Sequence, residues 1–351
     1  MSLQSTQVAD WLAEAGRFDT VIDARSPAEF AEDHLPGAVN WPVLDDAQRR
    51  IVGTLYKQVS PLQARKVGAS MVARNIAEHI DRWVADRPRE WRPLVYCWRG
   101  GQRSGSLAWF LGQIGFRTGQ LQGGYKAFRA QVRVELQSLP TRYRYQVLCG
   151  RAGSGKTRLL HTLADMGAQT LDLEGLAGHR GSVLGAVPGL AQPSQKRFDT
   201  LCWQALRSLD PDRPVFVEGE SRKIGVLRVP ETLIEQLHDR GHCLHVELSQ
   251  PARLQLLLQE YGHFADDTEG FCKLLDGLVE LRGRDLVTSW QALARGGRWA
   301  EVFEALMQAH YDPLYERSLR SSYRQLPQAT AVQLADAEAG TLQAAARSLL
   351  V

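Results

Sequence analysis

Residues 150–157 read Gly-Arg-Ala-Gly-Ser-Gly-Lys-Thr and match the complete G-x4-G-K-[S/T] pattern of a phosphate-binding loop, or P-loop. An apolar run at 146–149, typical of a buried strand, precedes the loop, and a helical pattern follows it. A strand, loop and helix in this order point backbone N–H groups at a bound diphosphate. Strand and helix patterns continue to alternate along the chain, which predicts a parallel sheet flanked by helices.

The P-loop supplies the candidate ligands of a diphosphate. Lys156 adds a positive charge, and Thr157 can reach a magnesium ion. The pattern is specific for a diphosphate but not for ATP, so the identity of the ligand stays open, and we expect no tightly bound cofactor. The predicted diphosphate-binding residues are Gly150, Gly153, Ser154, Gly155, Lys156 and Thr157.

Carboxylates follow two of the predicted strands. Glu218 and Glu220 end an apolar strand at 215–217, where an acid could orient a magnesium-bound water beside the P-loop. Asp172 and Glu174, after the preceding strand, are rivals for this task. An ordinary strand terminus with solvated acids is the alternative.

A glycine-rich loop at 176–185 carries His179 and Arg180 at its centre. Such a loop could close over a substrate, with Arg180 neutralising phosphate charge, or it could be a structural turn.

A second loop, residues 96–104, reads Tyr-Cys-Trp-Arg-Gly-Gly-Gln-Arg-Ser between a predicted strand and a predicted helix. The loop N–H groups and the positive end of the helix favour a thiolate and hold an anion above it. The thiolate could attack electrophilic sulfur, selenium or phosphorus. We predict Cys97 and Arg103 as catalytic residues, and an anion loop of Arg99, Gly100, Gly101, Gln102 and Ser104.

The length of 351 residues exceeds what one core usually fills, which favours two domains. The five cysteines are odd in number and lack a C-x2-C pair, so they are expected to be free thiols in a reducing compartment. No leader pattern or long apolar run is present, which predicts a soluble cytoplasmic protein without a membrane partner. A net charge of +3 is weak evidence for nucleic acid, although arginine outnumbers lysine.

The predicted domains are residues 1–139 around Cys97, residues 140–270 around the P-loop, and a helical extension at 271–351 that packs on the P-loop domain. The polar stretch near Pro140 is the predicted linker, because the apolar periodicity breaks there and restarts as a new strand.

The first domain resembles a rhodanese domain. The resemblance rests on Asp23-Ala24-Arg25, on the segment 34–40, on the Cys97 loop and on Gly123-Gly124-Tyr125. Arg103 lies six residues after Cys97, one more than is usual in sulfur-transferring rhodaneses. This spacing is shared with C-x5-R phosphatases and should give a roomier pocket. The expected fold class is α/β, with an N-terminal rhodanese-like domain, a C-terminal P-loop NTPase-like domain and a helical tail.

Over nearly its whole length the chain is similar to the tRNA 2-selenouridine synthase family. The similarity includes the segments 172–177, 179–182, 216–221 and 310–313. It implies that the wobble 2-thiouridine of tRNA is geranylated by geranyl diphosphate, and that selenium from selenophosphate then replaces the geranylthio group. It further implies that Cys97 carries selenium as a Cys–S–Se adduct. Leu176, Val183 and Leu184 near the P-loop are candidate walls for the geranyl chain, although each also suits a protein core. The expected partners are tRNA, geranyl diphosphate and selenophosphate, and the expected state is a monomer.

Three alternatives remain at this point. One is a rhodanese-type sulfurtransferase fused to an ATP-dependent kinase or ATPase. Another is a C-x5-R phosphatase, for which no aspartate general acid is assignable. The last is a non-catalytic tRNA-binding or regulatory module, against which the intact Cys97, Lys156 and Thr157 argue. The segment 310–313 has no role that the sequence explains.

Overall fold

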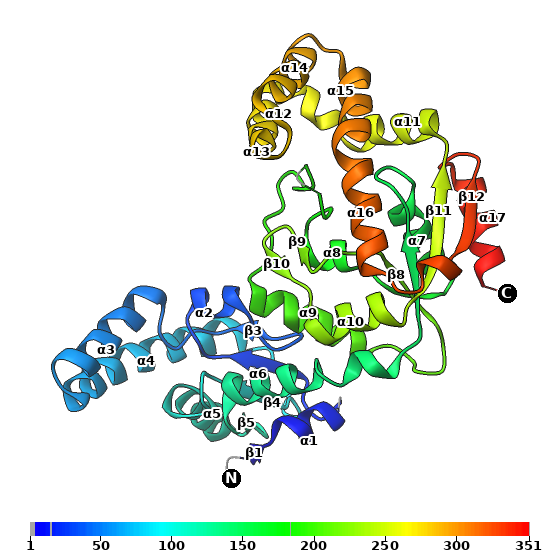
Figure 1. Ribbon diagram of the computed structural model, residues 1–351. Coiled ribbons are helices and arrows are strands. Elements are labelled where there is room, and N and C mark those ends of the chain that lie inside the picture. Colours follow the sequence, from blue (N-terminus) through cyan, green and yellow to red (C-terminus); the bar gives the residue numbers. More distant parts are fainter. Residues whose placement is uncertain (1–3, 15, 183, 351) are drawn as a thin grey trace. The chain divides into compact units, whose positions relative to one another are not determined.

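The computed structural model describes residues 4–14, 16–182 and 184–350 (Figure 1), and the chain divides into two compact units. Unit 1 comprises Met1–Glu135 and Pro193–Thr200, and unit 2 comprises Leu136–Gln192 and Leu201–Val351. The sequence prediction placed 193–200 in the P-loop domain. Contacts distant in sequence bind this segment into unit 1, including a 2.9 Å hydrogen bond from Thr200 Oγ1 to Asp33.

Unit 1 contains a five-stranded parallel sheet in the order β1-β5-β4-β2-β3. The central strand β4 is buried along its whole length, which explains its continuous apolar sequence. The edge strand β1 has no counterpart in the sequence prediction, because its three polar residues show no apolar pattern. The strands are β1 (Gln4–Thr6), β2 (Thr20–Asp23), β3 (Val39–Asn40), β4 (Pro93–Tyr96) and β5 (Gly119–Leu121).

Six helices of the described residues lie wholly within unit 1. The predicted helical stretch 45–86 forms two of them, because Ser60 caps a new helix and Pro61 occupies its first position. Ser60 Oγ accepts a hydrogen bond from Gln63 N at 3.1 Å. The helices are α1 (Val8–Ala13), α2 (Pro27–Glu32), α3 (Asp46–Gln58), α4 (Pro61–Trp83), α5 (Gln102–Ile114) and α6 (Gly124–Glu135).

Unit 2 contains a second five-stranded parallel sheet, in the order β12-β11-β6-β8-β7. The chain builds β7 and β8 on one side of β6, then crosses to β11 on the other side. This reversal at the carboxyl end of β6 is where open α/β sheets bind ligands. Helix α9 begins in the unit 1 segment 193–200 and continues into unit 2. The elements from η1 to β11 are η1 (Leu139–Arg142), β6 (Tyr145–Cys149), α7 (Lys156–Asp165), β7 (Gln169–Leu171), α8 (Leu173–Ala177), α9 (Gln195–Arg207), β8 (Val215–Glu218), β9 (Lys223–Ile224), β10 (Leu227–Arg228), α10 (Glu231–Asp239) and β11 (His242–Leu248).

The C-terminal region is mainly helical, as the sequence predicts, but it also returns a strand to the sheet. Strand β12 (Thr330–Leu334) pairs in parallel with β11, and α17 (Ala339–Leu349) packs on α7. Figure 1 shows α15 running into α16 through a single π-helical turn, η3 (Met307–Tyr311). The other elements are α11 (Gln250–Glu260), η2 (Gly262–Ala265), α12 (Thr268–Asp276), α13 (Val279–Arg282), α14 (Arg284–Arg295), α15 (Trp299–Leu306), α16 (Asp312–Ser322) and η4 (Leu326–Gln328).

The described residues include no helix that is long and apolar enough to cross a membrane.

Candidate functional site

Cys97 lies directly after β4 and is 3% exposed. The Ser104 hydroxyl lies 3.2 Å from Cys97 Sγ and is placed to donate a hydrogen bond to it. Gln120 Nε2 in turn donates to Ser104 Oγ at 3.0 Å and to Gly100 O at 2.8 Å. A donor aimed at sulfur stabilises a thiolate. The sequence prediction included Ser104 but missed Gln120, whose position depends on the pairing of β5 with β4.

The Cys97 loop rests on the first turn of α6. Cys97 O accepts a hydrogen bond from Tyr125 N, and Trp98 O accepts one from Lys126 N, both at 2.9 Å. Gly100 has a φ of +66°, and a Cβ at this position would lie 2.5 Å from Leu121 O. The loop therefore requires glycine where the two backbones meet.

Arg103 lies in the first turn of α5 and forms an ion pair within unit 1. Its Nη1 donates to Glu29 Oε2 at 2.6 Å, and its side chain is 17% exposed. Burial opposes ionisation of Glu29, but the hydrogen bond and charge of Arg103 outweigh it, so the pKa of Glu29 is lowered. An incoming anion must therefore share Arg103 with a carboxylate. The remaining predicted loop residues Arg99, Gly101 and Gln102 are exposed.

The six predicted diphosphate ligands come together at the end of β6. Gly153 and Gly155 have φ values of +71° and +84°, which the loop requires and which glycine tolerates. Lys156 Nζ donates to Gly150 O at 2.7 Å, so its charge lies inside the loop. Gly150 N donates to the hydroxyl of Tyr315, a residue that the sequence prediction missed. The positive φ values of the loop glycines and the position of the Lys156 cation are those that a diphosphate site requires.

Three glutamates gather beside the P-loop. Glu174, Glu218 and Glu220 each offer a carboxylate oxygen within 4.8 Å of the others. Burial, and then the neighbouring carboxylates, raise the pKa of Glu174 to about 10, and burial followed by Glu218 raises that of Glu220 to about 8. Glu218 is 2% exposed, and its Oε1 has no hydrogen-bond partner among the described residues. Closely spaced carboxylate oxygens with an unpaired acceptor are the donor set that Mg²⁺ prefers.

Asp172 is separate from this set of three glutamates. Its carboxylate caps α8 by accepting a hydrogen bond from Gly175 N at 2.7 Å, and it lies 3.0 Å from His161 Nε2. Of the two rival acids after β7, Glu174 therefore joins Glu218 and Glu220, and Asp172 has a capping role.

The glycine-rich loop passes over the glutamates. A Cβ at Gly181 would lie 2.8 Å from Glu174 Oε1. Arg180 is held by Glu260 O at 3.0 Å and lies over the ring of Tyr261, 5.2 Å from its centroid. Burial lowers the pKa of His179, which favours the neutral imidazole. Val183 lies outside the described residues, and Leu176 is half-buried.

The segment 310–313 is linked to the P-loop through Arg253. Asp312 pairs with Arg253 at 2.6 Å, and Arg253 Nε donates to the P-loop carbonyl Ala152 O at 2.9 Å. His310 Nδ1 accepts a hydrogen bond from Arg282 Nε at 3.0 Å. Arg253 is 59 residues from Asp312 in the sequence, so no local pattern could have identified this contact.

A cavity of about 340 Å³ opens at the P-loop within unit 2. Lys156, Thr157 and Arg180 line it together with Glu174 and Glu218, so these five residues face one space.

Comparisons with known proteins cover both units. The tRNA 2-selenouridine synthase AAA domain matches residues 143–278, and the rhodanese-like domain matches residues 5–131. A tRNA 2-selenouridine synthase of Hydrogenovibrio crunogenus is 32% identical, over 86% of this chain and 89% of that protein. One of Cupriavidus necator is 33% identical, over 84% and 87%. One of Nitrosomonas europaea is 34% identical, but the match spans 69% of this chain and only 63% of that protein.

Proposed function

The chain belongs to the tRNA 2-selenouridine synthase family, and on this premise we propose that it converts wobble 2-thiouridine of tRNA into 2-selenouridine through an S-geranyl intermediate. The observation that carries the proposal is that one chain holds two different anion sites. One has a nucleophilic sulfur, Cys97, and the other is a diphosphate loop with Lys156 inside it. A one-step sulfur transfer would use Cys97 but not the P-loop site.

In the first step, the sulfur of 2-thiouridine attacks C1 of geranyl diphosphate. The C–S bond forms and the C–O bond breaks. The electron pair leaves with diphosphate, and the base loses its N3 proton to solvent. The P-loop N–H groups, Lys156 and Arg180 stabilise the charge that develops on the leaving group. Thr157 and Glu218, together with Glu174 and Glu220, would hold Mg²⁺, which would neutralise further diphosphate charge.

In the second step, selenophosphate supplies selenium. This selenium is already at the oxidation level of selenide, so a Cys97–S–Se adduct would require an external oxidant, and we do not propose it. Attack of the Cys97 thiolate at phosphorus requires none. The S–P bond forms, the P–Se bond breaks, and the electron pair stays on selenium.

The released selenide then attacks C2 of the modified base. The C–Se bond forms, the C–S bond breaks, and the geranyl thiolate leaves and takes up a proton. Water hydrolyses the phosphocysteine to phosphate and the free Cys97 thiol. The prior geranylation matters because it turns a poor sulfur leaving group into a good one.

The test is mass spectrometry of the wobble nucleoside after incubation with 2-thiouridine tRNA, geranyl diphosphate and selenophosphate, omitting each in turn. Cys97→Ser should abolish selenium insertion while geranylated tRNA accumulates. Lys156→Ala should impair geranylation. Loss of both steps in Cys97→Ser, or normal geranylation in Lys156→Ala, would contradict this division of labour.

A separate experiment tests whether Cys97 attacks the phosphorus atom of selenophosphate. Selenophosphate labelled with ³²P should label wild-type protein transiently and Cys97→Ser not at all. Turnover of selenophosphate without any labelled wild-type protein in a rapid quench would exclude attack at phosphorus. ATP hydrolysis coupled to the reaction would instead favour a sulfurtransferase fused to an ATPase.

A further inference from the structure

The cavity at the P-loop has a chemically mixed lining. Lys156, Thr157 and Arg180 contribute polar and charged groups to it. The helical C-terminal region and the glycine-rich loop contribute an apolar wall. The wall consists of Leu184, Leu257, Phe303, Leu306 and Met307.

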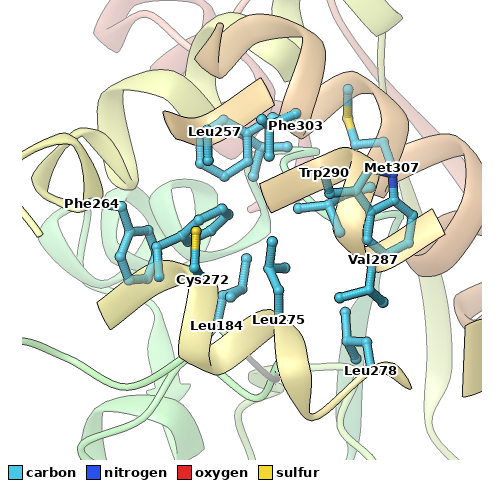
Figure 2. Packing of buried hydrophobic residues seen from close by; sticks show 14 residues of the cluster. Leu184, Leu257, Phe264, Cys272, Leu275, Leu278, Val287, Trp290, Phe303 and Met307 are labelled. Atoms are coloured by element: carbon cyan, nitrogen blue, oxygen red, sulfur yellow. The ribbon is translucent and has the colours of Figure 1, made fainter. Parts of the chain in front are cut away.

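The apolar wall is part of a packed core. Figure 2 shows Leu184, Leu257, Phe303 and Met307 within one cluster of buried side chains. Their exposed fractions range from 1% for Met307 to 6% for Leu257. Core side chains of this kind keep a fixed shape, because their rotamers are held by neighbours. The wall can therefore discriminate between ligands by size.

Two backbone features bring this wall to the P-loop. Gly153 has a positive φ, and a Cβ there would lie 2.9 Å from Leu257 Cγ, so loop and wall are in direct contact. The π-helical turn that begins at Met307 ends at Tyr311, and both residues line the cavity. Such turns are rare and occur frequently at functional sites.

We propose that the apolar wall of this cavity binds the hydrocarbon chain of the diphosphate donor, and that Phe303 and Met307 set the length of chain accepted. This inference rests on the proposed function. A chain esterified to a diphosphate at Lys156 must leave the P-loop through the same cavity, and the apolar wall is the surface it meets there. The cavity volume of about 340 Å³ is near the lower limit for small-molecule sites, which favours a short chain.

An alternative place for the chain exists in unit 1. A groove of about 840 Å³ runs beside the Cys97-loop helix α5, and its lining includes Arg103, Val72, Trp109 and Phe110. It is larger, but it adjoins no diphosphate loop within its own unit. This groove provides a matched control, because a phenylalanine lines each space.

The experiment compares Phe303→Leu with Phe110→Leu in the full chain. Dissociation constants are measured for inorganic diphosphate and for the dimethylallyl, geranyl and farnesyl diphosphates. Each methylene buried in an apolar site strengthens binding roughly fourfold, so geranyl diphosphate should bind wild type more tightly than inorganic diphosphate. Phe303→Leu should raise the farnesyl-to-geranyl affinity ratio roughly tenfold or more, while Phe110→Leu should leave it unchanged.

Inorganic diphosphate reports whether the P-loop remains folded, and Met307→Ala serves as a second truncation if Phe303→Leu does not fold. A shift in the ratio with Phe110→Leu alone would place the chain in the unit 1 groove and overturn the inference. Equal affinities for inorganic and geranyl diphosphate in wild type, or tighter binding of ATP than of geranyl diphosphate, would also overturn it. Chain-length selective binding without transfer to tRNA would support the chain site but contradict the proposed function.

Discussion

Two glycines of unit 1 allow the steric demand of the Cys97 loop to be measured. Gly100 and Gly37 have nearly the same positive φ, at +66° and +70°. A Cβ at Gly100 would lie 2.5 Å from Leu121 O and 3.1 Å from Gly123 N, whereas a Cβ at Gly37 would meet nothing within 4 Å. Alanine at either position would therefore pay the same conformational cost, but only at Gly100 would its Cβ also clash with neighbouring backbone.

The shared cost is the left-handed conformation, about 1–2 kcal/mol for a residue with a Cβ. Gly37→Ala should lose that amount of stability and no more. Gly100→Ala must also displace the backbone of β5 or of the Gly123 turn, since neither contact is with a flexible side chain. Overpacking of this kind adds about 1–3 kcal/mol. The expected loss is therefore about 2–5 kcal/mol for Gly100→Ala.

Hydrogen exchange of peptides from β4 and α5, read by mass spectrometry, reports opening of this unit separately from the other. Because the loop that carries Cys97 packs against the displaced backbone, Gly100→Ala should also impair selenium insertion while geranylation continues. Equal losses of protection in the two variants would refute the steric argument. Full selenium insertion in a Gly100→Ala protein would show that the loop tolerates the displacement.

Further predictions concern the P-loop unit. Folding raises the pKa of Glu220 to about 8 and that of Glu174 to about 10. The protonated carboxyls therefore contribute their full stability below about pH 4.5. This contribution declines as the pH rises toward the raised pKa of each group. The Tm, measured without divalent cations, should therefore fall between pH 5 and pH 8. Glu220→Gln should make this fall in Tm smaller. An equal fall in Tm in the variant would exclude Glu220 as the cause. Asp312→Asn should release Arg253 and so weaken the binding of inorganic diphosphate roughly tenfold. Glu316→Gln removes only an exposed ion pair and should have little effect on this binding. Equal effects of the two variants in a binding titration would contradict the positioning role of Asp312.

Local motifs were sufficient to predict both loops. The P-loop pattern and the Cys97 loop each lie within nine consecutive residues, and their glycines, strand and helix are set by neighbours in the sequence. The same holds for the α/β fold class, because the alternation of apolar strands and amphipathic helices is a local property. The resemblance of the chain to its family also follows from such short segments.

The structure corrected the predictions where distant residues compete for the same group. Arg103 appears in the sequence as a free anion ligand, but Glu29, 74 residues away, holds it in an ion pair. The sequence pattern did not distinguish Asp172 from Glu174 as the acid beside the P-loop. In the structure only Glu174 lies with Glu218 and Glu220, while Asp172 caps α8. Strand β12 lies within a tail predicted as helical, because its pairing with β11 depends on a partner more than eighty residues earlier.

The sequence alone determined which chemical groups this protein holds: a thiol in a loop between a strand and a helix, a P-loop, and acids at the ends of strands. Tertiary structure decided what each group faces. It placed Ser104 against the Cys97 sulfur, Arg253 against the P-loop carbonyl of Ala152, and an apolar wall from Leu184 and residues 257–307 in the P-loop cavity. The physical reason is that composition and local spacing set the conformation of short segments. Charge pairing, burial and cavity shape depend on which distant segments the packed core brings together.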